Sequence, residues 1–272
     1  MKRVLTVLIF VSMCSAVLAS EVDTVLIYSS SMKKNIKTVV IRPAGYNGNT
    51  RFPVLYLLHG YSGAFDNWIK KVPALRGLAD QHQMIIVCPD GAYGSWYFDS
   101  PVDSSYRYET FVGSEVPAFI DRTYRTIENR KGRAIAGLSM GGHGALFLAF
   151  RHSETFGACG SMSGALDVSQ ITKGYDMVKR LGDTAANRSY YQNWSVMKVI
   201  ENYPKDSLAI IIDCGTEDMI YAMSRAVHEK MMRLKIQHDY IERPGKHEWP
   251  YWANAVKYQV LFFDEFFRKG RL

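Results

Sequence analysis

The alternation of apolar and polar positions near the start of the chain predicts two β-strands. Residues 22–28 and 36–41 are rich in β-branched side chains that alternate with polar ones, and a polar turn over residues 29–35 separates them. Successive side chains of a strand point to opposite faces, so this pattern is typical of a strand with one buried face. The short separation predicts that the two strands pair as an antiparallel hairpin.

Continuous apolar runs follow the hairpin, and helical periodicity fills the intervals between them. Residues 54–58 are apolar throughout and end abruptly at His59, as expected for a strand that is buried on both faces. Later strands are predicted at residues 84–88, 133–137, 157–162, 208–214 and, more weakly, 239–242. Helices are predicted at residues 67–81, 109–122, 140–151, 219–234 and 251–267.

The order of these elements predicts the fold class. Repeated alternation of strand and helix behind an antiparallel hairpin favours an α/β fold, with a mostly parallel sheet and helices on both faces. Residues 165–206 interrupt the alternation with a polar and aromatic stretch, which we interpret as an insertion with short helices. The sequence shows no internal repeat or linker, so residues 20–272 are predicted to form a single domain.

The first nineteen residues have the pattern of a secretory signal peptide. Lys2 and Arg3 form a basic start, residues 4–11 are an apolar run, and residues 17–19 end in the small residue Ala19. A transmembrane helix would need about 18 or more apolar residues, which this segment lacks. We therefore expect cleavage after Ala19, a secreted or periplasmic protein and no stable membrane anchor.

The net charge and the cysteines narrow the function further. Cleavage removes Lys2 and Arg3, which lowers the formal net charge from +7 to +5, and the other basic residues are scattered along the chain. Nucleic-acid binding would need a clustered basic patch, so we expect no nucleic-acid partner. Cys88, Cys159 and Cys214 each lie at the end of an apolar run, which predicts buried thiols, although one pair could oxidise outside the cytosol.

A candidate nucleophile lies where a predicted strand meets a predicted helix. Residues 137–141 read Gly-Leu-Ser-Met-Gly, and in this setting the Gly-x-Ser-x-Gly pattern is typical of a nucleophile elbow. The flanking glycines let neighbouring chains approach the turn, and the helix directs its N-terminal amides at developing negative charge. The pattern predicts Ser139 as the nucleophile; the alternative is a tight turn with an incidental serine.

A serine nucleophile needs a general base, and His247 is the histidine best placed to act as one. It follows the last predicted strand and precedes the last predicted helix, as the chain order nucleophile, acid, base of α/β hydrolases requires. His143 lies one turn into the helix after Ser139, which points it away from the hydroxyl. The remaining candidates adjoin charged stretches and are expected to be solvated; they are His82, His152, His228 and His238.

The base needs a carboxylate that fixes its tautomer and stabilises its charged form. Three candidates follow the strand predicted at 208–214. We favour Asp218, because it lies in the loop beyond Gly215, where it can reach the loop of the base. Asp213 lies at the end of the strand and is the second candidate, and Glu217 is the third.

Two backbone amides are candidates for an oxyanion hole. One is Met140, directly after the nucleophile, and the other is Tyr61, in the loop after the strand at 54–58. His59 is expected to hydrogen-bond neighbouring loops, and the chemistry requires no metal or cofactor. Aromatic residues of the loops at this edge are candidates for substrate binding, with packing as the equal alternative; they are Trp68, Trp96, Tyr97 and Trp249.

These motifs together resemble the esterase D-like branch of the α/β-hydrolases. That branch includes S-formylglutathione hydrolases, feruloyl esterases, secreted mycolyltransferases and tributyrin-type esterases. The resemblance runs from Val54 to Phe267 and is closest to the tributyrin and feruloyl esterases, chiefly through the His-Glu-Trp motif at 247–249 and Trp252. It implies the α/β-hydrolase fold and the same triad and oxyanion amides, with the 165–206 insertion near the active site.

The sequence therefore predicts a secreted serine carboxylesterase that acts on short acyl, acetyl or feruloyl esters, as small molecules or linked to plant polysaccharide. The signal peptide argues against S-formylglutathione, a typically cytosolic substrate. One alternative is an acyltransferase, similar to the mycolyltransferases, that acts on a sugar or lipid alcohol. The other is an inactive module that binds carbohydrate or a protein partner, which the complete triad disfavours. The oligomeric state is open.

Overall fold

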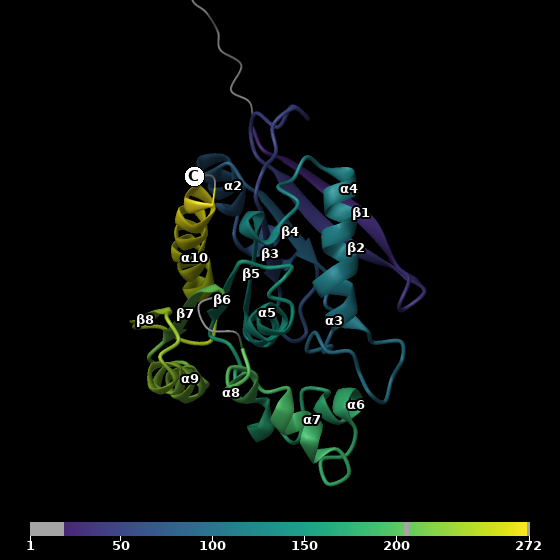
Figure 1. The fold of residues 1–272 in the computed structure, drawn as a ribbon, viewed down its shortest axis with the longest axis vertical. Coiled ribbons are helices and arrows are strands. Elements are labelled where there is room, and N and C mark those ends of the chain that lie inside the picture. Colours follow the sequence, from purple (N-terminus) through teal and green to yellow (C-terminus); the bar gives the residue numbers. More distant parts are fainter. Residues whose placement is uncertain (1–18, 204–206, 271–272) are drawn as a thin grey trace, which may run out of the picture.

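The computed structural model describes residues 19–203 and 207–270, which are built around one β-sheet (Figure 1). Within these residues eight strands pair in the order β1-β2-β4-β3-β5-β6-β7-β8. The pairs β1–β2 and β2–β4 are antiparallel, and the remaining neighbours run parallel. The predicted hairpin and mostly parallel sheet are confirmed. The strands are β1 (Glu21–Ser29), β2 (Lys34–Arg42), β3 (Val54–Leu58), β4 (Ile85–Pro89), β5 (Arg133–Leu138), β6 (Ala158–Met162), β7 (Ala209–Gly215) and β8 (Asp239–Arg243).

Strand β3 shows why the central strands are continuous apolar runs. All of its residues are buried. Tyr56 and Leu58 pack in the core on one face of the sheet, whereas Leu55 and Leu57 pack in the core on the other face. A strand that is covered on both faces has no polar side, so its sequence does not alternate.

Helices cover both faces of the sheet, as predicted. On one face lie α1 (Asn67–Lys71), α2 (Leu75–His82) and α10 (Trp249–Lys269). On the other face lie α3 (Tyr108–Thr110), α4 (Val116–Thr123), α5 (Met140–Arg151) and α9 (Tyr221–Leu234).

Two of the predicted helices are interrupted. The helix expected at 67–81 is divided into α1 and α2, because Pro73 between them lacks a backbone N–H and disfavours a helical residue before it. The helix expected at 109–122 contains a π-helical segment, Phe111–Glu115, between α3 and α4. A π segment inserts an extra residue into the helical repeat, which the spacing of apolar residues does not reveal.

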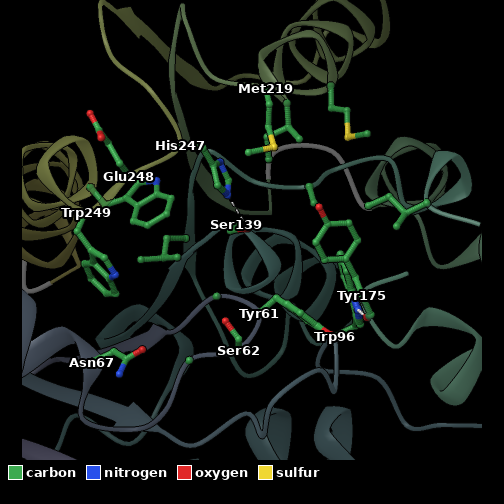
Figure 2. Close-up of a pocket in the computed structure, with 18 residues that line it drawn as sticks. Tyr61, Ser62, Asn67, Trp96, Ser139, Tyr175, Met219, His247, Glu248 and Trp249 are labelled. Atoms are coloured by element: carbon green, nitrogen blue, oxygen red, sulfur yellow. Dashed lines mark hydrogen bonds between the residues drawn. The ribbon is translucent and has the colours of Figure 1, made fainter. Parts of the chain in front are cut away.

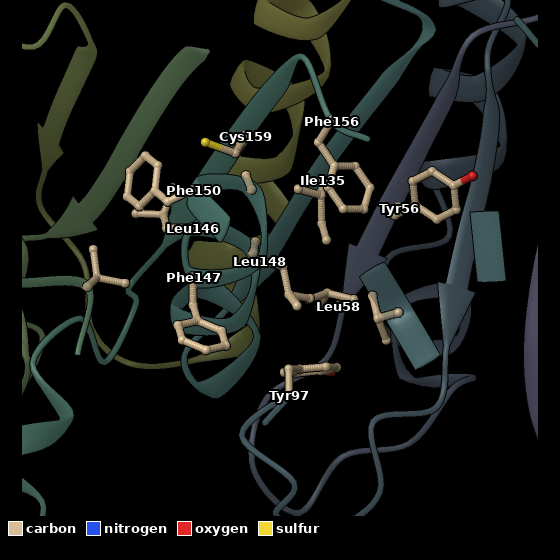
Figure 3. Packing of buried hydrophobic residues seen from close by; sticks show 14 of the residues in the cluster. Tyr56, Leu58, Tyr97, Ile135, Leu146, Phe147, Leu148, Phe150, Phe156 and Cys159 are labelled. Carbon is tan, nitrogen blue, oxygen red and sulfur yellow. The ribbon is translucent and has the colours of Figure 1, made fainter. Parts of the chain in front are cut away.

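Helix α5 fixes the position of the turn that precedes it. Its residues from Met140 to Phe150 are all buried, so it is enclosed on every side. Figure 3 shows Leu146, Phe147 and Leu148 of this helix in one cluster with Ile135 of β5. Because protein interiors are close-packed, such a helix has little freedom to shift, and its first turn is held rigidly at the end of β5.

The described part of the predicted insertion, residues 165–203, contains short helices and packs against α5. These are η3 (Val168–Gln170), α6 (Met177–Leu181), α7 (Arg188–Asn193) and α8 (Val196–Val199), and Figure 1 shows α6 and α7 beyond one end of the sheet. His143 of α5 is buried and donates from Nε2 to the carbonyl oxygen of Trp194 at 3.0 Å. Burial lowers the pKa of His143 to about 4, so the imidazole is neutral and structural. As predicted, the ring does not contact the Ser139 hydroxyl, and His143 bonds to Ser139 only through its backbone amide, which donates to the Ser139 carbonyl oxygen at 3.0 Å.

Three further predictions concern the signal peptide, a membrane anchor and the cysteines. The predicted signal peptide lies outside the described residues except for Ala19. Across the described ranges, no helix is both long enough and apolar enough to cross a membrane. Cys88, Cys159 and Cys214 are buried free thiols, as predicted, and burial raises the pKa of each.

Candidate active site

Ser139 lies at the strained turn between β5 and α5. Its φ of +54° is in the region that L-residues rarely adopt. The turn is possible because its flanking residues are glycines: a Cβ on Gly137 would lie 2.3 Å from the carbonyl oxygen of Gly141. A Cβ on Gly141 would lie 2.5 Å from the carbonyl oxygen of His59. The chain therefore holds the Ser139 hydroxyl out of the sheet edge, in a partly exposed position.

His247 is placed to take the proton of this hydroxyl. Its Nε2 lies 2.9 Å from Ser139 Oγ, and its Nδ1 lies 2.9 Å and 3.0 Å from the two carboxylate oxygens of Asp218. An Nδ1–H that donates to the carboxylate leaves the Nε2 lone pair free to accept from the serine. The three residues thus form one hydrogen-bonded chain, although they come from three separate loops.

Asp218 is buried, and its carboxylate faces His247. Burial by itself would raise the pKa of Asp218, but hydrogen bonds from His247 and from the Ile220 amide hold it below its usual value. The carboxylate is therefore ionised near neutral pH and can stabilise a positively charged imidazole.

The other two carboxylates considered for this position point elsewhere. Asp213 is buried and accepts hydrogen bonds from Tyr251 Oη at 2.5 Å and from the Arg243 guanidinium at 2.6 Å. Burial raises its pKa, and these two donors partly offset that effect. Glu217 is exposed to solvent. Asp213 therefore joins β7 to β8 and α10, and Asp218 alone of the three contacts His247.

Backbone contacts bind the loops of the acid and the base together. The Glu217 amide donates to the Gly245 carbonyl oxygen at 3.0 Å, and the Thr216 amide donates to the Arg243 carbonyl oxygen at 2.9 Å. A Cβ on Gly215 would lie 2.2 Å from the Gly245 carbonyl oxygen, so the two loops touch directly. The distance between Asp218 and His247 is thus set by main-chain packing.

Two backbone amides adjoin the nucleophile. Met140 is the first residue of α5, and Tyr61 follows Gly60, whose backbone packs so closely that a Cβ there would lie 3.3 Å from Ser139 Cβ. Within the described residues neither amide donates a hydrogen bond. Amides of this kind, directed at a reacting centre, are the elements of an oxyanion hole.

His59 holds the Tyr61 loop in place through hydrogen bonds to neighbouring loops, as the sequence predicts. Its Nδ1–H donates to the Gly60 carbonyl oxygen at 2.8 Å, and its Nε2 accepts from the Gly91 amide at 2.8 Å. Its own carbonyl oxygen accepts from Tyr97 Oη at 3.0 Å. These bonds engage both ring nitrogens, so His59 has a structural position beside the site.

A cavity of about 730 Å³ opens above Ser139, and aromatic side chains form much of its wall. Figure 2 shows Trp96 and Trp249, two of the predicted binding residues, on opposite sides of the nucleophile. The prediction missed Asn67, Tyr175 and Met219, which also line the cavity. Met219 directly follows Asp218, which is the one local signal that could have indicated it.

Two aromatic residues predicted to bind substrate do not line this cavity. Trp68 is buried in the core beneath Trp249 and donates from Nε1 to the Leu58 carbonyl oxygen at 3.0 Å. Tyr97 is fully buried and supports the His59 loop. Trp68 lies in α1 and Tyr97 lies in a loop, and each ring turns inward because the core offers its polar atom a carbonyl oxygen.

The histidines expected to be solvated are instead partly buried and hydrogen-bonded. The partners of His82 and His152 come from distant segments, so the charged local sequence does not reveal them, whereas His228 and His238 pair with each other across ten positions. The pairs are His82 with Asp264 at 2.9 Å, His152 with Glu109 at 3.1 Å, and His228 with His238 at 2.8 Å. Among the residues that the structure describes, no group of three or more His, Cys, Asp or Glu side chains could hold a metal ion.

Comparison with known proteins accounts for this arrangement. The sequence model of the family described as "Putative esterase" matches residues 29–263, which is most of the chain. The chain belongs to this esterase family. It has the α/β-hydrolase fold and is a carboxylic ester hydrolase, as the sequence predicts.

Relatives of this esterase include both hydrolases and a transferase. An acetyl esterase of Caldicellulosiruptor saccharolyticus is 25% identical over 264 residues, which cover 87% of this chain and 97% of the relative. A diacylglycerol acyltransferase/mycolyltransferase, Ag85A of Mycobacterium gordonae, is 27% identical over 273 residues, which cover 87% of this chain and 78% of the relative. The chain spans about half the length of the matching esterases of Mycobacterium tuberculosis.

A solved structure of a ferulic acid esterase has the same fold. It superposes with a TM-score of 0.80 at 28% sequence identity, and the match covers 92% of this chain and 99% of that one.

The contacts of the two buried aspartates generate a matched pair of variants. Asp218→Asn should lower kcat by about 10³–10⁴-fold, because the amide favours the wrong imidazole tautomer, and should leave thermal unfolding nearly unchanged. Asp213→Asn should lower the free energy of unfolding by about 3 kcal/mol, because it leaves Arg243 without its charged partner. Nitrophenyl-ester kinetics and thermal unfolding of both variants measure this. Loss of activity in Asp213→Asn without loss of stability would reverse the assignment.

Proposed function

We propose that this esterase is a secreted serine carboxylesterase that hydrolyses its substrate through an acyl-serine intermediate. The hydrogen-bonded chain from Ser139 through His247 to Asp218, at the floor of an open cavity, carries the proposal. A serine hydroxyl is a weak nucleophile near neutral pH, and a base within hydrogen-bonding distance is what activates it.

In the first step Ser139 Oγ attacks the ester carbonyl carbon while its proton moves to His247 Nε2. The imidazole becomes positively charged, and the adjacent ionised Asp218 stabilises it. The carbonyl oxygen becomes an oxyanion, which accepts hydrogen bonds from the Tyr61 and Met140 amides. Removal of one such donor typically costs about 3–4 kcal/mol of transition-state stabilisation.

After the attack His247 acts as an acid, then as a base and finally as an acid again. It donates its proton to the leaving alcohol oxygen as the tetrahedral intermediate collapses to the acyl-enzyme. A water molecule then attacks the acyl carbon while His247 accepts its proton, and His247 returns that proton to Ser139 Oγ as the carboxylic acid product leaves. No step requires a metal or a cofactor.

The substrate class that we propose is an ester of a short acyl, acetyl or feruloyl group. The similarity of the chain to an acetyl esterase and to a ferulic acid esterase supports this class. The cavity supports it as well, because its aromatic wall at Trp96 and Trp249 suits a compact or aromatic acyl group.

The role of the nucleophile can be tested directly. Ser139→Ala should lower the hydrolysis of 4-nitrophenyl acetate by about 10⁵-fold or more, because the acyl-enzyme can no longer form. A burst of nitrophenol equal to the enzyme concentration should appear with the native protein and vanish in the variant. Retention of native rates in a folded Ser139→Ala protein would refute the triad.

Acyl transfer is the second candidate function, and the acyltransferase relative favours it. Transfer needs the same acyl-enzyme, which an alcohol intercepts in place of water. Because the cavity is open to solvent, we expect water to prevail. With 4-nitrophenyl butyrate as donor and glycerol or glucose as acceptor, mass spectrometry should find mainly free butyrate. A predominance of the acylated acceptor at millimolar acceptor concentration would make the protein a transferase.

We propose export on the basis of the signal-peptide pattern, and the contacts of Ser20 support it. Ser20 is buried, its amide lies 3.4 Å from Asp80 Oδ2, and Arg76 donates to its carbonyl oxygen at 2.7 Å and to its Oγ at 3.2 Å. Cleavage after Ala19 would turn this amide into an ammonium group beside a carboxylate. The contact would then become an ion pair, so the processed chain gains an interaction that the precursor lacks.

This gain can be measured as a difference in stability. A chain that begins at Ser20 should unfold with a free energy about 1 kcal/mol larger than one that retains Ala19. In Asp80→Asn the two chains should have equal stability, because no carboxylate remains to pair with the ammonium group. Mass spectrometry of the exported protein should give Ser20 as the first residue. A difference that persists in Asp80→Asn would refute the ion pair.

A further inference from the structure

The first strand of the sheet leaves one of its edges unpaired. Strand β1 pairs with β2 along its whole length, and no strand of the described residues pairs with its other edge. Figure 1 shows the β1–β2 hairpin at the far side of the sheet from β8. An edge strand presents a row of unpaired backbone N–H and C=O groups, which can pair with a strand of another chain.

Strand β1 lacks the features by which edge strands commonly resist such pairing. Proteins protect an edge with lysine, with proline or with a β-bulge. The nine residues of β1 include no lysine and no proline. They pair with β2 in one unbroken register from Glu21 to Ser29, so the strand has no bulge. Its free edge is therefore long and regular.

Apolar side chains are exposed along one face of β1. Alternate residues of a strand share a face, and the four residues of this face are all exposed: Val22, Thr24, Leu26 and Tyr28. Leu26 and Tyr28 are each 58% exposed, and Val22 is 38% exposed. A further strand beside β1 would cover them, because same-face residues of paired strands lie about 4.5–5.5 Å apart.

We propose that β1 pairs antiparallel with β1 of a second copy of this chain, across a twofold axis at Val25. Full overlap of residues 21–29 with themselves places Val25 opposite Val25 of the second copy. The same register places Val22 opposite Tyr28 and Thr24 opposite Leu26, so the exposed face of one strand continues into that of the other. The interface is self-complementary, as twofold symmetry requires.

The charges of the hairpin suit an antiparallel arrangement. Glu21 and Asp23 lie at the start of β1, and Arg42 of β2 pairs with them at 2.5 Å and 3.0 Å. The antiparallel register brings this acidic start beside the end of the other strand, next to the turn that carries Lys33. Lys33 is exposed and forms no ion pair within the described residues. A parallel pairing would instead bring the two acidic starts together, and like charges repel.

This pairing leaves the two catalytic sites independent. In the sheet order, β2, β4 and β3 separate β1 from β5, which leads to Ser139. A twofold axis between antiparallel strands reverses the strand direction, so the two cavities open at opposite edges of the shared sheet. Substitutions in β1 therefore change association and leave the catalytic site intact.

The size of the interface sets the expected affinity. Standard stable interfaces comprise about 20–30 residues on each side, whereas β1 has nine. We therefore expect a reversible dimer with a dissociation constant in the micromolar range. Sedimentation velocity of the native protein between about 1 and 200 µM should show the dimer fraction rise with concentration. A protein that stays monomeric over that range would refute the proposal.

A substitution in β1 and an equally exposed leucine elsewhere form a matched pair. Leu26→Lys should raise the dissociation constant about tenfold or more, because it places an ammonium group on the strand that pairing would cover. Leu261→Lys, at a 50% exposed position of α10, should leave it unchanged. Unfolding at the native temperature would show that both variants are folded. Native dimerisation of Leu26→Lys would place the interface elsewhere and overturn the proposal.

Disulfide trapping tests the register of the two strands. Directly opposite residues of antiparallel strands have Cα atoms about 4.5–5.5 Å apart, which a disulfide can bridge. Cys88, Cys159 and Cys214 are buried, so an introduced cysteine is the accessible thiol in a Cys14→Ser background.

In that background Val25→Cys should oxidise to a covalent dimer. Tyr28→Cys should not, although Tyr28 is the more exposed residue, because the two copies of position 28 lie about 20 Å apart in this register. Random collision would favour the more exposed thiol and so give the opposite result. Cross-linking of Tyr28→Cys that equals or exceeds that of Val25→Cys would refute the pairing across Val25.

Discussion

The strained backbone of Ser139 is the constraint on which the rest of the site depends. A residue with φ of +54° is unfavourable for an L-amino acid, and it persists only where the surrounding structure enforces it. Here β5 ends inside the sheet and α5 begins inside the core, so neither neighbour can relax. Gly137 and Gly141 complete the constraint, because any Cβ at either position would collide with main chain.

A rigid nucleophile can react only if the loops that carry Asp218 and His247 are held equally rigidly. Main-chain hydrogen bonds and the contact of Gly215 with Gly245 set the spacing of those loops. Side-chain polarity is then divided between two buried aspartates. Asp213 ties Arg243 and Tyr251 to the sheet, which leaves Asp218 free to serve His247. Asp213 therefore stabilises the fold and Asp218 serves catalysis. Substitution of Asp213 should lower stability, whereas substitution of Asp218 should lower activity.

The sequence reveals the parts of this molecule that follow from local rules. Strand runs such as 54–58, the hairpin, and the Gly-x-Ser-x-Gly turn each follow from periodicity or steric demand within a few residues. The orientation of Trp68 and Tyr97 does not, because a distant carbonyl oxygen decides whether an aromatic ring turns into the core. The same reason explains His82, because Asp264 determines the environment of its ring although 182 positions separate the two residues. Asn67 and Tyr175 were equally hidden, since only the tertiary fold brings them to Ser139.

Hydrolysis and transfer are two outcomes of one geometry at this site. Microscopic reversibility requires that a site which releases an alcohol as the acyl-enzyme forms also binds that alcohol for the reverse attack, with His247 as its base. Water and alcohol then compete for the same acyl carbon. The outcome depends on how long an alcohol is bound beside His247 during the life of the acyl-enzyme, and a cavity that is open to solvent favours brief binding. The contacts made to the alcohol would then distinguish an esterase from a transferase, and the triad would be the same in both.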